Sequence, residues 1–327
     1  MDSPQAWSVF RRAHIDDIIQ QGQQDTLCGT INSHLRTINI QYTLNSRPKE
    51  FYESELRDVW YTLIQAGKNI TTHQLYQDGV IYECRQESII RDLVTFRALG
   101  TLQRSVQSST QDNNSKGIGI ITFSDGYTLW SGLPLLSTCL IDEFTKCYYQ
   151  KDYSMEQREN MAGLLARLLA AGFYDGPALC AVSLFQKSLE TPRPLVTDSE
   201  TPEVLLPLEG LLDALMDLCQ NSGYGLAILS SSQTSAASLT KTNAADYPYL
   251  SDVGELALQA GTTASPLTGY SPQRWKFWVQ RLSELRQCGI ENIELKAKSC
   301  LSSLYQAGEE TNLLPGLISQ ELIIYED

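Results

Sequence analysis

The most constraining feature of the sequence is the segment from Met161 to Phe173, because apolar side chains cover it on almost every side. Its large apolar residues recur at helical spacing on one broad face, and alanines cover much of the remainder. A helix with so little polar surface is stable only when other helices pack around it. We therefore expect the longer stretch from Tyr127 to Phe173, which holds this helix and another before it, to form the hydrophobic centre of the chain.

Amphipathic segments before and after this centre predict further helices. Acidic residues open the segment 49–67, and Pro177 begins a helix that stops at Glu190, just before two prolines. Ser271 followed by Pro272 is typical of a helix start. The other expected helices cover residues 4–23, 25–40, 73–99, 203–221 and 291–306. The pattern predicts an all-α, multi-helix globular array of about ten or more helices.

Polar and proline-rich segments between these helices predict long surface loops. The expected flexible insertions cover residues 105–117, 192–202 and 229–246. The last of them lies within a long connection that we expect from Gly223 to Pro248, and the apolar run at 118–123 allows at most a minor strand. A chain of 327 residues can form one large domain or two packed halves, and we favour a single helical domain over residues 1–327.

The charge of the chain limits its partners. A net charge of −13 with an isoelectric point near 4.7 argues against nucleic acid and anionic membrane surfaces as partners. The N-terminus lacks a basic start followed by an apolar run, and no later segment approaches the roughly 18 apolar residues of a spanning helix. We expect a cytoplasmic protein without a membrane span.

Recognisable cofactor and metal motifs are missing from the sequence. Eight cysteines are scattered without a C-x-x-C pair, which predicts small buried thiols in a reducing compartment, and histidine occurs only at positions 14, 34 and 73. Asp16-Asp17 is half of an aspartate-rich magnesium motif without its third acid. Gly223-Tyr224-Gly225 follows a helix and lacks the third glycine of a dinucleotide-binding turn. We expect no metal and no cofactor.

Several short blocks of sequence occur together. They are the Trp60-Tyr61 helix ending in Ala66-Gly67-Lys68, Leu129 to Pro134, the helix from Asn160 to Gly172, Leu189-Glu190-Thr191-Pro192, and Arg274-Trp275-x-x-Trp278-x-x-Arg281-Leu282. With these blocks the chain resembles, over residues 50–305, the ascomycete family catalogued as domain of unknown function 3632. The resemblance implies a helical protein that is often encoded beside fungal secondary-metabolite genes. The chain departs from the family pattern in polar insertions at 101–118 and 226–245.

Aromatic residues at helix ends and on apolar faces are the candidates for contact with a small molecule. The candidate substrate-binding residues are Trp60, Tyr61, Tyr127, Trp130, Tyr174, Trp275 and Trp278. The candidate catalytic residues are Arg167, Glu143, Asp175 and His73. In the simpler interpretation the aromatic residues fill the core, and His73 only marks the start of a helix.

Two functions of different class fit this sequence. The first, favoured by the gene-cluster association that the resemblance implies, is a cofactor-independent cyclase or isomerase of fungal secondary-metabolite biosynthesis, specifically an intramolecular Diels–Alder type pericyclase that acts on a hydrophobic terpenoid or polyketide. Such catalysis relies on positioning and a few hydrogen bonds, and so needs no motif. The second is a non-enzymatic helical interaction or regulatory protein. A large apolar cavity lined from residues 127–173 and 271–285 would favour the first function, and a filled core with an exposed apolar groove the second.

Overall fold

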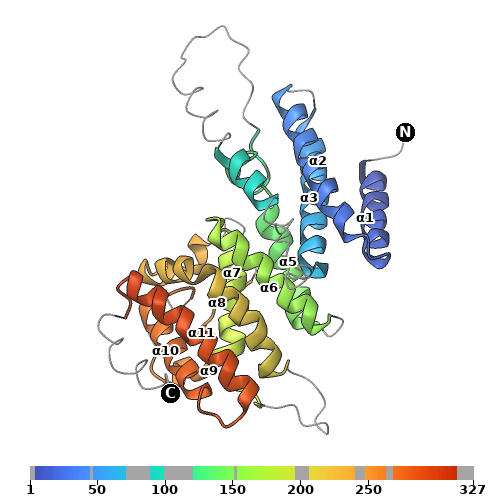
Figure 1. The fold of residues 1–327 in the computed structure, drawn as a ribbon. Coiled ribbons are helices and arrows are strands. Elements are labelled where there is room, and N and C mark those ends of the chain that lie inside the picture. Colours follow the sequence, from blue (N-terminus) through green and yellow to red (C-terminus); the bar gives the residue numbers. More distant parts are fainter. Residues whose placement is uncertain are drawn as a thin grey trace, which may run out of the picture. The chain divides into compact units, whose positions relative to one another are not determined.

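The structure is a computed structural model, in which residues 4–44, 47–70, 89–98, 121–150, 153–195, 206–239, 247–262 and 268–314 are described. The chain divides into two compact units, Met1–Asn160 and Met161–Asp327 (Figure 1). The described parts are helical and contain no sheet, which confirms the expected all-α fold. Their isolated β-bridges join Thr122 to Thr128 and Asp252 to Thr268. The expected single domain stays a prediction.

Unit 1 is built around one central helix. Its helices are α1 (Pro4–Gln20), α2 (Gln24–Thr43), α3 (Lys49–Asn69), an unlabelled helix at 89–98, and α5 (Leu136–Tyr149). α3 packs against α1, α2 and α5, which makes it the centre of this unit. The apolar residues that predicted α3, among them Leu56, Trp60 and Leu63, are completely buried. α6 (Met155–Ala170) begins in unit 1 and ends in unit 2.

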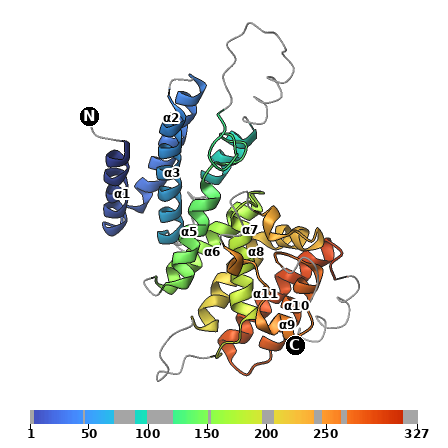
Figure 2. The same cartoon turned by 180° about the vertical axis from the view of Figure 1, so that it is seen from behind.

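Unit 2 is centred on a pair of long helices. Its elements are α7 (Pro177–Phe185), which continues as a π-helical turn (Gln186–Glu190), then α8 (Leu208–Ser231), α9 (Glu255–Gln259), α10 (Pro272–Leu285) and α11 (Glu291–Glu310). α8 and α11 lie side by side (Figure 2). Lys296 of α11 pairs with Asp213 of α8, and further along Ser299 meets Gln220, so the two helices run in the same direction.

Most predicted helix starts are confirmed, whereas several helices end further along the chain than predicted. Ser271 accepts a hydrogen bond from the Arg274 N–H at 3.1 Å, as expected of an N-cap before Pro272. α8 begins after Pro207, within the predicted 203–221 segment, but it continues to Ser231 instead of giving way to a connection at Gly223. α11 is four residues longer than the predicted helix at its C-terminal end. Residues 89–98 are helical, while the rest of the predicted 73–99 helix and the 105–117 insertion lie outside the described residues.

Two further observations concern the described residues only. None of their helices has both the length and the apolar character that crossing a membrane requires. No disulfide joins the described cysteines, and the buried ones are Cys28, Cys147, Cys180, Cys219 and Cys300.

Candidate functional site

A pocket of about 310 Å³ lies within unit 2. The end of α6 with the following Tyr174, the middle of α8, and the last turns of α11 form its walls. Its volume is at the lower end of the roughly 300–1,000 Å³ typical of small-molecule sites. Tyr174 is the one candidate substrate-binding residue among the lining residues, and Tyr224, Gln306 and Glu310 also line the pocket. This pocket is therefore the candidate functional site.

Two glycines of α8 shape the pocket. A Cβ placed on Gly223 would lie 3.5 Å from the Ala307 side chain of α11, and one on Gly225 would lie 3.5 Å from the Tyr174 ring. These are ordinary contact distances, so a side chain larger than alanine would push its neighbours away. The glycines thus bring α11 and Tyr174 close to α8, while Tyr224 between them is 56% exposed.

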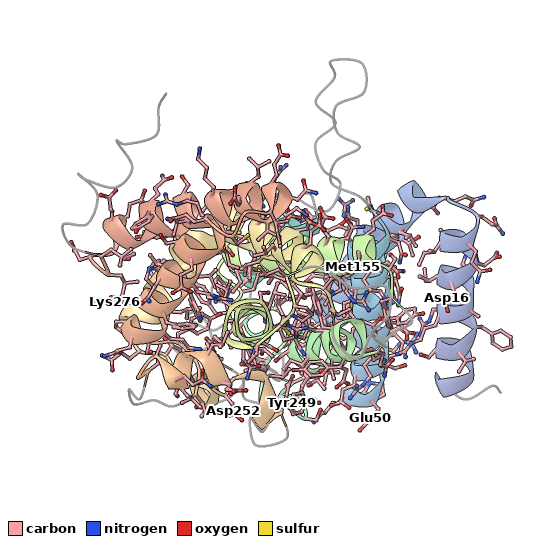
Figure 3. All side chains as sticks on the ribbon, turned by 90° about the horizontal axis from the view of Figure 1, so that it is seen from below. Asp16, Glu50, Met155, Tyr249, Asp252 and Lys276 are labelled. Atoms are coloured by element: carbon pink, nitrogen blue, oxygen red, sulfur yellow. The ribbon has the colours of Figure 1, made fainter. Side chains whose placement is uncertain are left out.

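A second feature of unit 2 is a buried ion pair between Arg274 and Glu190. The Arg274 Nε lies 2.5 Å from one Glu190 carboxylate oxygen, and Nη2 lies 2.9 Å from the other. The remaining guanidinium N–H groups donate to the carbonyl oxygens of Ser251, Gly269 and Asp252 (labelled in Figure 3) at 2.9, 2.7 and 2.8 Å. The five N–H groups of the guanidinium are thereby all used.

The carboxylate oxygens of Glu190 also have their hydrogen-bonding capacity filled. Besides Arg274, its two oxygens accept the indole N–H of Trp278 at 2.6 Å and the backbone N–H of Gly254 at 2.7 Å. Trp278 in turn stacks on Phe185 with ring centroids 4.2 Å apart. Neither charged group retains a donor or acceptor for a ligand, so this pair, which we call the Arg274 clamp, serves to hold the backbone at Ser251, Asp252 and Gly269 in place.

The candidate catalytic residue Glu143 lies in unit 1, in a compact polar cluster. It forms an ion pair with Lys68 and accepts the Tyr153 hydroxyl at 3.2 Å. The Lys68 ammonium also lies 4.8 Å from the centre of the Tyr153 ring. Burial raises the pKa of Glu143, but the hydrogen bond and charge of Lys68 outweigh it and the pKa is lowered overall. Glu143 is therefore ionised near neutral pH and cannot donate a proton there.

The candidate tryptophans of unit 1 are core residues with satisfied indole groups. Trp60 is completely buried and donates to the carbonyl of Pro134 at 2.7 Å. Trp130 is 1% exposed, donates to the Asn39 side chain at 2.9 Å, and stacks on Phe96. They occupy packing positions, as the simpler interpretation of the aromatic residues has it.

The turn around Trp130 is unusual in its backbone. Trp130, Leu133 and Leu135 have φ values of 65°, 48° and 67°, a region that costs energy for residues with a side chain. The carboxylate of Asp125 holds the turn by accepting the N–H groups of Leu135 at 2.5 Å and Tyr127 at 3.1 Å. The block that carries part of the family resemblance is thus a locally strained turn.

The remaining aromatic candidates have separate environments. The Tyr61 hydroxyl donates to Asp16 (labelled in Figure 3) at 2.5 Å, and burial, followed by this bond, raises its pKa. The Tyr127 ring covers Gly132, where an added Cβ would lie 2.0 Å from the ring. In unit 2, Trp275 is completely buried, and its indole N–H has no hydrogen-bond acceptor among the described residues.

Three of the catalytic candidates are not at the pocket. Arg167 and Asp175 are partly buried residues of unit 2 that do not line it, Glu143 belongs to unit 1, and His73 lies outside the described residues. Among the described candidates, the structure therefore brings only Tyr174 to the pocket, and the roles assigned to the other candidates stay predictions. Sequence reasoning missed Tyr224 because the helix was expected to end at residue 221; two glycines flanking a tyrosine were the available signal.

Metal chemistry has no evident site in the described parts of the chain. Within them, no group of three or more His, Cys, Asp or Glu side chains is arranged to hold a metal ion.

Comparisons with known proteins assign the chain to a family. The model of the family "Protein of unknown function (DUF3632)" matches residues 60–282. Over 245 residues the chain is 26% identical to "Oxopyrrolidines biosynthesis cluster protein G" of Penicillium oxalicum (strain 114-2 / CGMCC 5302), an alignment that covers 72% of this chain and 60% of the relative. The chain thus spans less than two thirds of that relative's length. No solved structure matches the chain.

Proposed function

Because the chain belongs to the DUF3632 family and is a distant homologue of a fungal biosynthesis-cluster protein, we propose that it is a cofactor-independent cyclase or isomerase of a secondary-metabolite pathway. The observation that carries this proposal is the pocket of about 310 Å³ with Tyr174 in its wall. Tyr174, which the sequence predicted to contact a substrate, lines a cavity of suitable size. The whole relative's role belongs to a longer protein and supports only the pathway class.

The lining of the pocket fits catalysis by positioning. Tyr174 and Tyr224 offer flat apolar rings against which a flexible substrate can fold, and their hydroxyls can donate to a carbonyl oxygen. In an intramolecular Diels–Alder reaction such a bond stabilises the polarised transition state, while the walls hold diene and dienophile at reacting distance. The reaction conserves all atoms and needs no external proton or electron, so a site without an acid–base pair suffices.

A non-enzymatic interaction protein is the second candidate. The observation that favours it is the burial of the predicted substrate-binding tryptophans: none is more than 1% exposed, and those of unit 1 are fully hydrogen-bonded inside the core. Under this interpretation the pocket would hold a side chain of a partner instead of a metabolite.

Gene deletion followed by metabolite profiling separates the two candidates. The cyclase predicts accumulation of an uncyclised isomer with the same mass as the missing product, and the purified chain should convert that isomer in vitro. Tyr174→Phe should lower turnover through loss of one hydrogen bond, and Tyr224→Ala through loss of a wall. Ile228→Ala, at a residue 37% exposed on the same helix but outside the pocket lining, is the matched control.

An unchanged metabolite profile after deletion would contradict the enzymatic proposal. So would loss of the whole pathway without any accumulated isomer, combined with normal chemistry by the other pathway enzymes in vitro. That second result is the one expected of a regulatory or interaction protein.

A further inference from the structure

The charged side chain that lines the pocket of unit 2 is negative. Glu310 is a lining residue, and no lysine, arginine or histidine lines the pocket among the residues that the structure describes. Two helices also end there, since α6 ends at Ala170 and α11 at Glu310, and both of these residues line the pocket. The C-terminal end of a helix carries partial negative charge. The carboxylate and the two helix ends therefore produce a negative potential in the pocket.

Hydrogen bonding within α8 strengthens this bias. Asn221 donates from its side-chain nitrogen to the Asp217 carbonyl at 2.9 Å, and the Ser222 hydroxyl donates to the Leu218 carbonyl at 2.6 Å. Both partners are carbonyl oxygens, which can only accept, so the direction of each bond is fixed by chemistry. The Asn221 oxygen remains as an acceptor in the pocket lining.

The lining residues of α11 show the same arrangement. Gln306 donates from its side-chain nitrogen to the Glu310 carboxylate at 3.3 Å, and the Ser303 hydroxyl donates to the Ser299 carbonyl at 3.3 Å. The amide oxygen of Gln306 and the second carboxylate oxygen of Glu310 remain as acceptors. Each of these side-chain amides also keeps one N–H, so it is the charge of the Glu310 carboxylate that disfavours a carboxylate or phosphate ligand.

The aromatic walls complete the set of features that recognise a cation. Tyr224 is 56% exposed and Tyr174 is partly buried, and both line the pocket together with Glu310. Aromatic faces attract ammonium groups, and the attraction grows when a carboxylate lies nearby.

From these observations we infer that the pocket selects a substrate carrying a protonated amine. The inference rests on the proposed function, because it names the chemical class of the molecule bound at that same site. Glu310 and the amide oxygens bind the N–H groups, and the tyrosine rings cover the adjoining carbon skeleton. Substrates with a carboxylate in that position are rejected by the negative potential.

Three probes of similar size test the inference on the full chain. Phenethylamine is cationic at neutral pH, phenethyl alcohol is neutral, and hydrocinnamate is anionic, so a titration followed by ligand-detected nuclear magnetic resonance isolates the effect of charge. We expect phenethylamine to bind about five- to tenfold more tightly than phenethyl alcohol, as one partly solvated charge contact allows, with hydrocinnamate the weakest.

Two charge variants form a matched pair. Glu310→Gln should remove most of the preference for the amine, whereas Glu309→Gln, at an exposed neighbour that does not line the pocket, should leave most of it. Circular dichroism checks that both variants are folded. Equal or tighter binding of hydrocinnamate, absence of saturable binding by phenethylamine, or equal effects of the two variants would each overturn the inference.

The two proposals fail in different ways. If the probes show no preference for the amine while Tyr174→Phe still slows product formation, the substrate class is wrong and the cyclase stands. If phenethylamine binds as expected but gene deletion leaves the metabolite profile unchanged, the amine site stands and the cyclase is wrong.

Discussion

Removal of one partner from the Arg274 clamp should destabilise unit 2 strongly. Glu190→Gln keeps the shape of the side chain but deletes its charge, so the guanidinium of Arg274, 1% exposed, loses its counter-ion. The side-chain amide of the variant also carries an NH2 group in place of one carboxylate oxygen. This NH2 group faces one of the N–H groups that donate to Glu190, which include the Trp278 indole N–H and the Gly254 backbone N–H. Breaking a buried ion pair in this way costs about 3–5 kcal/mol.

The size of this effect is measurable by urea unfolding and thermal melting followed by far-ultraviolet circular dichroism. For a unit of this length, each kcal/mol lowers the Tm by roughly 2–4 °C, so we expect a decrease of about 6–20 °C. Glu284→Gln serves as the control, because its pair with Arg281 is on the surface with Glu284 50% exposed. That variant should lose less than about 1 kcal/mol.

A double-mutant cycle with Arg274→Met separates pairing from other losses. If the two charges are coupled as the geometry indicates, the double variant should be less destabilised than the sum of the single variants by about 1–3 kcal/mol. A loss of less than about 1 kcal/mol for Glu190→Gln would refute the reasoning, since a buried charge without a partner cannot be that well tolerated.

Three further predictions use other described features. Gly254→Ala should destabilise unit 2 although its backbone is ordinary, because the added Cβ would lie 2.5 Å from the Glu190 Cβ; urea unfolding measures the loss. The folded-state pKa of Glu143 lies below its ordinary value of 4.5, so ionised Glu143 stabilises the folded state fully above that pH and loses this contribution as the pH falls. Glu143→Gln should therefore flatten the acid side of a curve of unfolding free energy against pH. Burial raises the pKa of the Cys180 thiol, so under native conditions a thiol reagent should label the partly exposed Cys288 long before Cys180. Mass spectrometry measures the two labelling rates, and equal rates would contradict the packing of α7.

The helices were predictable because each carries a strong local pattern. α10 begins where Ser271 and Pro272 predicted, and its buried residues include Trp275 and Trp278. The end of α8 was not predictable in the same way. Gly223 and Gly225 each cost a helix about 1 kcal/mol relative to alanine, and only close packing with Tyr174 and α11 offsets that cost.

The candidate site was predictable only in part, for a related reason. Tyr174 was identified as a contact residue, but the pocket needs residues of α8 and α11 that a local pattern cannot bring together. The Arg274 clamp shows the same limit, since its two charged residues are 84 positions apart and nothing in either block indicates the other as a partner. Long-range polar pairing depends on the packed fold and not on local sequence.

The clamp also gives unit 2 an optical reporter of its own. Trp275 and Trp278 are the tryptophans of residues 161–327, both are completely buried, and Trp278 bonds directly to Glu190. Indole fluorescence moves to longer wavelength when water reaches the ring. In a chain whose other tryptophans are replaced by phenylalanine, the emission wavelength would therefore report when water reaches the indole beside the Arg274 clamp, without an added dye.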